Sequence, residues 1–383
     1  MESQDTKYMQ MALGLAKRGL GSVEPNPAVG CVIVKSDQVI GRGWHKAFGG
    51  PHAEVHAIQD CRTIGASPDG ATLYVTHEPC CHHGKTGPCT DAIIAAGLRK
   101  VVVATGDPSK YASGAGLRQL QQAGIDVITG VCEDEARLLN APFFKFVEKG
   151  RCWVVLKWAQ SLDGKLAHAN PAMGQWLSGE MSRRDAQILR RRTQAILVGV
   201  NTVIADNPQL TPKPSKGHNP LRIVLDRSLR IPLTCRLLST AKRHPLLVCT
   251  TARAMEMKPR AVKSIQKKGA ELLIGPDSND NTNLPFILRQ LGDRGIQQLL
   301  VEGGAKVIGS FLQEDLADEI CAYLTPVLLG NHGVADLGLF LNGLASGIHL
   351  HHLEIKRLGD DVRIRGLTPI PALRTATTTG PQP

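Results

Sequence analysis

The sequence predicts an α/β protein made of two domains. At 383 residues the chain is longer than most single domains, and short β-rich runs alternate with helical stretches through both halves. A charged connector ends at Gly150, and a new apolar run, WVVLKWA, begins at Trp153. We therefore expect one domain over residues 1–148 and a second over 149–370. The Thr-, Pro- and Gly-rich residues 371–383 are expected to form a disordered tail.

The composition is typical of a water-soluble globular enzyme. Hydrophobic residues make up 42% of the chain, which is enough to bury a core in each domain. No run approaches the ~20 apolar residues that a membrane helix needs. The first twenty residues lack the apolar segment of a signal peptide. The ten cysteines have no regular spacing, so we expect a reducing cytoplasm and no disulfide framework.

The excess positive charge lies entirely in the second half. Residues 1–150 hold 15 basic and 15 acidic side chains, whereas residues 151–383 hold 30 and 19, which accounts for the net charge of +11. A basic surface suits nucleic acid, a membrane surface or phosphorylated small molecules. Few aromatic residues accompany the Arg and Lys, so we favour a phosphorylated small molecule over nucleic acid or membrane. An ordinary solvated surface would account for most of these charges.

The first half reads as strands and helices that place polar residues at strand ends and helix starts. We expect a β-rich run over residues 28–40, a helix over 52–61, a strand over 71–76, a helix over 90–96 and a strand over 100–104. Residues 133–149 read as a helix followed by the charged connector. His52 and Glu54 would then lie in the first turn of a helix, and the strand ending at Thr76 would deliver the loop that carries Cys80.

His52-Ala53-Glu54, Pro79-Cys80 and Cys89 form the pattern of a catalytic zinc site. Zinc takes about four ligands, and a catalytic zinc keeps one position for water. One His and two Cys leave that position open. Glu54 would not be a ligand but would accept a proton and pass it on. This is the pattern of zinc nucleobase deaminases, and it predicts hydrolytic removal of an amino group from a nitrogen heterocycle.

Two features leave an alternative open at this point. The nine-residue spacing of the cysteines is longer than the usual Cys-x-x-Cys, and Cys81 could compete with Cys80 for the metal. We favour Cys80 because Pro79 precedes it, just ahead of an expected helix start. A structural zinc knot would leave His52 and Glu54 without a purpose. Its ligands would be drawn from Cys80, Cys81, His82, His83 and Cys89. We interpret the two adjacent histidines as groups that face the substrate or support the ligands.

The second half reads as strands at the spacing of an α/β domain. We expect strands over residues 153–159, 195–200, 221–226, 245–250 and 298–301, and helices over 182–192 and 305–313. The last strand leads into Glu302-Gly303-Gly304 and a helix, where backbone N–H groups and the helix dipole can hold a phosphate. Gly-Gly also serves as a plain turn. No Gly-x-Gly-x-x-Gly pattern occurs, so a Rossmann domain is not expected.

The chain resembles the bifunctional deaminase–reductase family of riboflavin biosynthesis over roughly residues 5–370. In the first half the resemblance rests on PNPAVG at residues 25–30, PHAEV at 51–55 and EPCCHHGKTGPC at 78–89. The nine-residue cysteine spacing is the normal one in that family. In the second half it rests mainly on Lys157, SLDG at 161–164, Gln175-Trp176, Leu210-Thr211 and VEGG at 301–304.

The resemblance implies a fold and two reactions. The first domain would be a cytidine-deaminase-like three-layer domain, and the second a dihydrofolate-reductase-like α/β domain. Zinc-dependent hydrolysis would deaminate 2,5-diamino-6-(5-phosphoribosylamino)pyrimidin-4-one. NADPH-dependent reduction of its ribosyl chain would then give 5-amino-6-(5-phosphoribitylamino)uracil. The resemblance also implies a homo-oligomer, because an interface through the second half is common in related enzymes.

The resemblance also assigns roles to residues of this chain. It implies that His52, Cys80 and Cys89 bind zinc and that Glu54 is the proton shuttle. The residues implied to bind the substrate are Asn26, His45, Lys85, Lys157, Arg190, Leu210, Lys213 and Glu302. The residues implied to bind NADPH are Ala159, Trp176, Thr202, Asp206, Gly304, Ala305, Lys306, Val307, Ile308, Gly309 and Ser310.

Departures from the family pattern keep other hypotheses open. His77, Cys81 and Gly87 replace the usual Leu, Ser and Pro without removing a zinc ligand. Other departures are at Ser109, Lys110, Gly174 and Lys213. Lys in place of Arg loses the bidentate fork that binds phosphate. The second half could therefore be a degenerate reductase that acts as a binding or oligomerisation module. An RNA-editing deaminase and a non-catalytic zinc scaffold are further alternatives.

Overall fold

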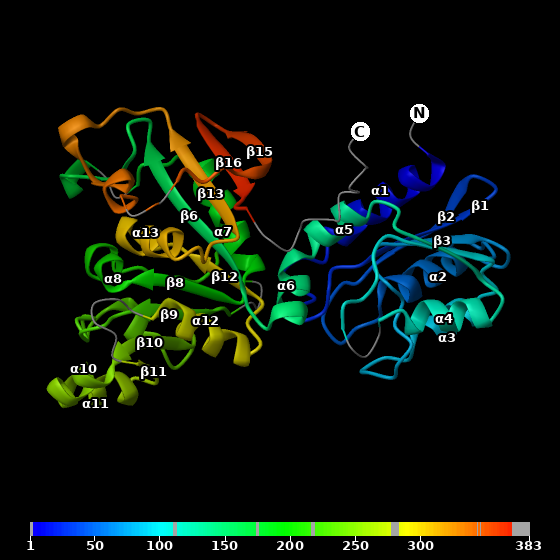
Figure 1. Ribbon diagram of the computed structural model, residues 1–383, viewed down its shortest axis with the longest axis horizontal. Helices are drawn as coiled ribbons and strands as arrows, with labels where there is room; N and C mark the ends of the chain where they lie inside the picture. The colour runs from blue at the N-terminus through cyan, green and yellow to red at the C-terminus, as the bar shows by residue number, and fades with distance from the viewer. Residues whose placement is uncertain are drawn as a thin grey trace, which may run out of the picture. The chain divides into compact units, whose positions relative to one another are not determined.

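The computed structural model describes residues 3–109, 113–173, 176–215, 219–276, 283–342, 344 and 346–369. The chain divides into two compact units, Met1–Arg151 and Cys152–Pro383 (Figure 1). The expectations for Lys110, Gly174, Gln175 and the tail lie outside the described residues. Across the described ranges, no helix combines the length and the apolar character needed to span a membrane.

The first unit is built on a five-stranded sheet with the strand order β2-β1-β3-β4-β5. Its strands are β1 (Gly30–Lys35), β2 (Gln38–Trp44), β3 (Thr72–Val75), β4 (Lys100–Val103) and β5 (Asp126–Thr129). Strands β3, β4 and β5 are parallel, whereas β1 is antiparallel to both of its neighbours. The carboxyl ends of β3 and β4 therefore lie at one edge of the sheet.

Helices cover both faces of this sheet and form the expected three layers. One face packs on α2 (Ala53–Thr63), α3 (Cys89–Ala95) and α4 (Ala115–Gln122), and the other on α1 (Gln4–Ala16) and α5 (Glu133–Leu139) (Figure 1). The alternation of buried strand residues makes this possible: Ile33 faces the first core and Val32 the second. A Cβ at Gly30 would lie 2.0 Å from the Ala12 carbonyl oxygen, so only glycine lets α1 approach this closely.

The second unit is built on a nine-stranded sheet with the strand order β11-β10-β9-β8-β12-β6-β13-β16-β15. Its strands are β6 (Trp153–Ser161), β8 (Ala195–Gly199), β9 (Leu221–Leu225), β10 (Leu246–Thr251), β11 (Glu271–Gly275), β12 (Gln298–Val301), β13 (Glu319–Thr325), β15 (His351–Leu358) and β16 (Asp361–Leu367). The run from β11 to β13 is parallel, and β16 and β15 extend it antiparallel. A separate antiparallel pair joins β7 (Lys165–His168) to β14 (Gly333–Asp336).

Helices connect the parallel strands of the second unit, as the alternating pattern predicts. They are α7 (Glu180–Arg192), α8 (Val200–Asp206), α9 (Arg236–Ser239), α10 (Ala252–Met257), α11 (Pro259–Lys267), α12 (Leu284–Asp293) and α13 (Ala305–Gln313). The core between the sheet and α12 and α13 holds Leu156, Leu197 and Val301 from the central strands and Ile287 and Phe311 from the helices. Apolar central strands of this kind are expected where both faces of a parallel sheet are covered.

The expectation of a charged connector before Gly150 was wrong. Residues 133–149 form two helices, α5 and α6 (Ala141–Lys149), with Asn140 between them. The acidic residues that open this stretch lie in the first turn of α5, where they complement the helix dipole. Pro142 falls in the first turn of α6, a position where proline favours a helix start.

Candidate active sites

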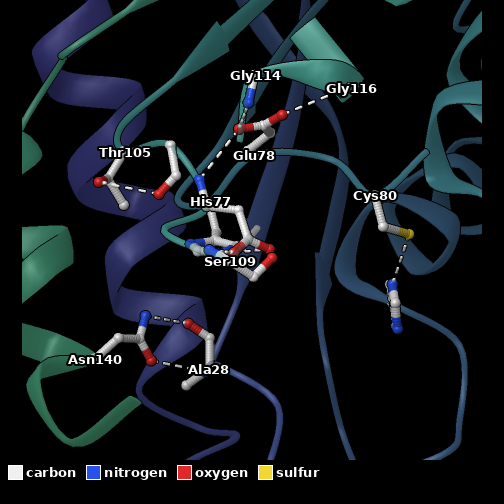
Figure 2. Close-up of polar contacts among 12 residues, drawn as sticks. Ala28, His77, Glu78, Cys80, Thr105, Ser109, Gly114, Gly116 and Asn140 are labelled. Atoms are coloured by element: carbon white, nitrogen blue, oxygen red, sulfur yellow. Dashed lines mark hydrogen bonds and ion pairs between the residues drawn. The ribbon is translucent and has the colours of Figure 1, made fainter. Parts of the chain in front are cut away.

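Three side chains converge at one edge of the first sheet. His52 is the N-cap residue of α2, Cys80 lies in the loop after β3, and Cys89 is the first residue of α3. The His52 Nδ1 atom lies 3.2 Å from the Cys89 sulfur and 3.5 Å from the Cys80 sulfur. The dashed line from Cys80 in Figure 2 marks the second contact. The three ligand atoms lie within 4.8 Å of one another, an arrangement that can hold one metal ion.

The chemistry of this donor set fits zinc. A hydrogen bond from the Cys89 thiol lowers the pKa of Cys80 to about 4 against the effect of burial, and contacts with His52 act in the same direction. A thiolate is the form of cysteine that binds metal. Glu54 is only 3% exposed, and its Oε2 atom has no hydrogen-bond partner among the described residues. Burial raises the pKa of Glu54. A catalytic zinc keeps one coordination position for water, and such a water would be the missing hydrogen-bond partner of the Glu54 oxygen.

The structural zinc knot is not formed by the described residues. The metal-capable group contains His52, Cys80 and Cys89 alone within those residues. His82 and His83 are exposed and do not join it. The expected helix start just after Cys80 was also wrong, because α3 begins at Cys89, directly after Pro88.

The predicted substrate residues Asn26 and His45 lie together beside the ligands. The His45 ring is 2% exposed and packs edge-on against the His52 ring, with 5.0 Å between centroids. Its Nδ1 lies 3.1 Å from the Pro51 carbonyl oxygen, and its Nε2 lies 3.4 Å from the Asn26 amide nitrogen. Burial lowers the pKa of His45, which favours a neutral ring that donates to Pro51 and accepts from Asn26. The Asn26 amide oxygen is then left for another partner.

Lys85, the third predicted substrate residue of this unit, is exposed and lies over an aromatic ring. Its Nζ atom is 4.0 Å from the centroid of Phe48. An ammonium over the face of an aromatic ring remains accessible to an anionic group. The structure does not bring Lys85 into hydrogen-bond contact with Asn26 or His45.

Glu78 is a buried residue that the sequence interpretation missed. Its Oε2 atom accepts hydrogen bonds from the backbone N–H groups of Asp107 and Gly114, and its Oε1 atom accepts one from Gly116, each at 3.1 Å (Figure 2). Gly116 must be glycine because a Cβ would lie 2.1 Å from the Pro79 carbonyl oxygen. The only sequence signal was an acidic residue directly before Pro79-Cys80.

Asn140 was also missed. Its side-chain amide exchanges two hydrogen bonds with the backbone of Ala28, at 2.8 and 3.0 Å (Figure 2). Both residues are buried. Asn140 therefore fixes the segment that carries Asn26, and the sequence offered no sign of this beyond a polar residue between two helical runs.

In the second unit the predicted cofactor residues gather where the parallel strands end. The register pairs Leu156 of β6 with Val301, the last residue of β12, so Lys157 and Ala159 lie beyond the end of β12. A Cβ at Gly304 would lie 3.7 Å from the Thr202 hydroxyl, which places the starts of α13 and α8 side by side. Ligands of open parallel sheets bind at this edge.

The start of α13 can hold an anionic group of a cofactor. The N–H groups of Ala305 and Lys306 have no acceptor within the helix, because the first intrahelical bonds are from Val307 and Ile308 to the Gly304 carbonyl oxygen. The side chains of Ala305 and Ile308 are buried in the core. The residues present therefore fit a phosphate-bearing cofactor such as NADPH through the backbone of this first turn.

The remaining residues of the predicted cofactor set differ in their exposure. Trp176 is 59% exposed, and Asp206 is an exposed residue at the end of α8. The Ser310 hydroxyl donates to the Lys306 carbonyl oxygen within α13, and Gly309 packs against Phe340. Of residues 304–310, only the first few therefore lie where a cofactor could bind, and the later ones make contacts within the unit.

The predicted substrate residues of the second unit form a connected group around α7. The Arg190 guanidinium binds both oxygens of Glu302, at 3.0 and 3.1 Å from Nε. Burial raises the pKa of Glu302, but Arg190 and then Lys157 outweigh it and hold the pKa below its usual range. The Lys213 N–H donates to the Gln187 side chain, also on α7, at 2.9 Å. Arg190 therefore links α7 to Glu302 and, through it, to Lys157, and Gln187 links the same helix to Lys213.

Comparison with known proteins accounts for both sites. The family model for the cytidine and deoxycytidylate deaminase zinc-binding region matches residues 2–105, and that for the RibD C-terminal domain matches residues 152–364. The riboflavin biosynthesis protein RibD of Aquifex aeolicus is 42% identical over 94% of this chain and 97% of its own. RibD of Escherichia coli is 39% identical over 94% and 98%.

Solved structures agree with these matches over nearly the whole chain. Acinetobacter baumannii RibD superposes with a TM-score of 0.80 at 37% identity, covering 96% of this chain and 99% of that one. The Thermotoga maritima diaminohydroxyphosphoribosylaminopyrimidine deaminase/5-amino-6-(5-phosphoribosylamino)uracil reductase gives 0.79 at 36% identity with the same coverage. The chain therefore belongs to the RibD family, and it combines a zinc-dependent deaminase and a reductase of riboflavin biosynthesis in one polypeptide.

Proposed function

We propose that the first unit deaminates the phosphoribosylated diaminopyrimidinone and that the second reduces the ribosyl chain of the deaminated product. The observation that carries the first assignment is the convergence of His52, Cys80 and Cys89 beside the orphaned carboxylate of Glu54. The domains responsible are proposed to span residues 1–148 and 149–370. The division of the chain after Arg151 supports this boundary to within a few residues.

In the deaminase, the chain's own residues would bind zinc, move a proton and orient the pyrimidine. His52, Cys80 and Cys89 would bind zinc, which when bound activates water and acts as a Lewis acid. Glu54 would accept a proton at Oε2 and deliver it to the departing ammonia. Asn26, held by His45, would direct its amide oxygen to the exocyclic groups of the ring, and Lys85 would contact the ribose phosphate.

The substitution Glu54→Gln tests this assignment. It keeps the size of the side chain but removes its basicity, so we expect one zinc per chain with ammonia release reduced by at least about a hundredfold. Reduction of pre-deaminated substrate by the same variant is the internal control and should be unchanged. Normal ammonia release by the Glu54→Gln variant would show that Glu54 is not the proton shuttle. Zinc binding without ammonia release by the unmodified chain would support a non-catalytic zinc scaffold.

In the reductase, the chain would hold a cofactor and an open ribose imine side by side. NADPH, when bound, supplies the hydride. The first turn of α13, with Thr202 and Trp176, would bind its phosphates and orient its nicotinamide. Arg190, Glu302, Lys157 and Lys213 would position the substrate phosphate and the ribose hydroxyls. The other NADPH residues named above, Ala159, Asp206 and residues 307–310, are proposed to complete the site.

A coupled assay distinguishes this function from that of a deaminase whose second half is a degenerate reductase. The match of the RibD C-terminal domain does not favour the degenerate reductase. Ammonia release and NADPH oxidation are recorded together on the phosphoribosylated diaminopyrimidinone. Ammonia followed by NADPH oxidation supports both activities on one chain. Ammonia alone would mean that the second half is degenerate, and replacing NADPH by NADH in a parallel sample would show the cofactor preference.

We also propose a homo-oligomer that forms through the edge strand β15. The residues of β15 before Leu358 are exposed, including the apolar side chains of Leu353 and Ile355, and an uncovered edge of this kind favours pairing with a second copy. The double substitution of Leu353 and Ile355 by Lys should lower the mass measured by light scattering. The ten free cysteines and the proposed zinc thiolates suit a reducing compartment, so the cytoplasm is the proposed location.

A further inference from the structure

Arg222 of β9 is a buried cation without a carboxylate partner among its hydrogen bonds. Its side chain is 0% exposed and ranks among the largest fully buried side chains in the described chain. Its guanidinium donates to five oxygens at five residues: Gln209, Leu237, Thr240, His244 and Pro245. Four of these acceptors are backbone carbonyls and one is the Thr240 hydroxyl.

A charge in this position is costly and requires a reason. Burial lowers the pKa of Arg222 to about 10, so the side chain still carries its proton at neutral pH. Taking a guanidinium out of water costs several kcal/mol. Core packing alone therefore does not explain an arginine here. Its hydrogen bonds do, because they join the loop at Gln209 to α9 and to the residues directly before β10.

The loop that Arg222 joins to α9 carries two of the predicted substrate residues. Arg222 Nη1 donates to the Gln209 carbonyl oxygen at 3.2 Å, directly before Leu210. Leu210 is 3% exposed and has φ of +55°, a left-handed conformation that costs a residue with a Cβ about 1 kcal/mol or more. Such a conformation persists only where its surroundings hold it.

The other end of the same loop is fixed to α7. Lys213 donates its N–H to the Gln187 side chain at 2.9 Å and accepts from Arg191 at 3.3 Å. The adjacent residue of α7 is Arg190, which binds Glu302. The loop from Gln209 to Lys213 is therefore held at one end by Arg222 and at the other by the helix that carries the substrate group.

We propose that Arg222 is a positioning residue of the reductase, which holds residues 209–213 in the conformation that presents Leu210 and Lys213 to the phosphorylated substrate. The proposal rests on the proposed function of Lys213. Arg222 itself touches neither substrate nor cofactor. Its role is to hold the strained loop by bonds to backbone oxygens, which no neutral side chain of similar size could make in the same number.

The test compares Arg222→Lys and Arg222→Met with Thr240→Val in the full chain. Lysine keeps the charge, but its side chain is shorter and has three donors on a single nitrogen. Methionine removes the charge and all donors. Thr240→Val removes one partner of the same guanidinium without touching the loop, and it serves as the matched control. KM for the deaminated substrate, KM for NADPH, kcat and ammonia release are measured for each variant, with hydrogen exchange of the peptide that contains residues 209–213.

We expect both Arg222 variants to raise KM for the deaminated substrate about tenfold, the value of one hydrogen bond to a charged group. Ammonia release, kcat and KM for NADPH should stay within about twofold of the unmodified chain, and Thr240→Val should leave substrate KM unchanged. Hydrogen exchange of the loop peptide should become faster in the Arg222 variants only.

Two results would overturn the proposal. An unchanged substrate KM in Arg222→Lys would show that the loop does not depend on the guanidinium. A parallel loss of NADPH binding in both variants, or loss of the folded unit in both, would show that Arg222 supports the unit in general. Lys213→Ala separates this from the proposed function. If Lys213→Ala leaves substrate KM unchanged while Arg222→Lys raises it, the proposed contact between Lys213 and the substrate is wrong, but the proposal that Arg222 positions the loop still holds.

Discussion

Replacement of Glu78 by Gln should destabilise the first unit far more than an exposed Glu→Gln change. The Glu78 carboxylate accepts hydrogen bonds from three backbone N–H groups: those of Asp107 and Gly114 before α4, at Oε2, and that of Gly116 in its first turn, at Oε1. α4 has no acidic residue in its first turn, and its N-cap is Gly114, which offers no side-chain cap. Glu78 therefore acts as the cap of α4 from a distant part of the chain.

The size of the effect follows from these contacts. In either orientation, the NH2 group of a Gln side chain faces at least one of these backbone N–H groups and cannot accept its hydrogen bond. The hydrogen bonds that remain are made to a neutral amide oxygen instead of a charged carboxylate. A hydrogen bond to a charged group contributes about 1.5–3 kcal/mol, and an orphaned buried donor costs about 1–3 kcal/mol. We therefore expect a loss of about 2–5 kcal/mol. For a unit of this length that corresponds to a fall in unfolding temperature of about 5–15 °C.

The assay follows heat inactivation of ammonia release and of NADPH oxidation in the same sample. The reductase reaction is the internal control, because its unit does not contain Glu78. Glu148→Gln makes the same chemical change in the same unit at a carboxylate that is 31% exposed and pairs with Arg137 at 2.9 Å, and it should cost no more than about 1 kcal/mol. Equal thermal stability of the Glu78 and Glu148 variants would refute the reasoning.

Three further predictions concern the metal, a buried ion pair and pH. A zinc chelator should abolish ammonia release and leave NADPH oxidation on pre-deaminated substrate intact; loss of both would contradict separate sites. Glu302→Gln leaves the partly buried Arg190 without its carboxylate and should destabilise the second unit by about 3–5 kcal/mol, measured from the unfolding transition of that unit in calorimetry. Burial raises the pKa of Asp107, but the contacts with His77 and Ser109 have the larger, opposite effect and bring the pKa down to about 2. Because this pKa lies below the ordinary value of about 3.8, Asp107 contributes at most about 2 kcal/mol, fully present above pH ~4 and lost as the pH falls toward 2. The stability difference between the unmodified chain and Asp107→Asn in urea should shrink across that window, and a constant difference would be contrary to this account.

Much of the fold could be predicted from the spacing of apolar and polar residues. Strands β6, β9, β10 and β12 and helix α13 lie within a residue or two of the expected ranges, because buried parallel strands are short apolar runs between turn signals. The antiparallel strands β15 and β16 were not foreseen. Seven of the eight residues of β15 are exposed, so the strand lacks the alternation of apolar and polar residues that identifies a half-buried strand.

The zinc ligands could be predicted because few residue types can bind zinc. His52, Cys80 and Cys89 are separated by up to 37 positions, yet only His, Cys and carboxylates qualify, and the accompanying Glu54 limits the choice further. The pairing of Arg190 with Glu302 could not be foreseen in the same way. Arginine and glutamate are common surface residues, and nothing in their spacing of 112 positions indicates that they meet.

Glu78 and Arg222 show most clearly where such interpretation reaches its limit. Each is a buried charge whose hydrogen bonds go mainly to the backbone, Glu78 to N–H groups and Arg222 to carbonyl oxygens. A backbone partner is present at every position of a chain, so the sequence contains no complementary residue that would reveal the contact. Each lies next to loops that carry proposed site residues, Cys80 in one unit and Leu210 in the other. Both charges tie a loop to a rigid element with several bonds at once. A buried charge satisfied by the backbone is therefore well suited to hold an active-site loop in a strained or extended conformation, and its cost in desolvation is consistent with a role beyond stability.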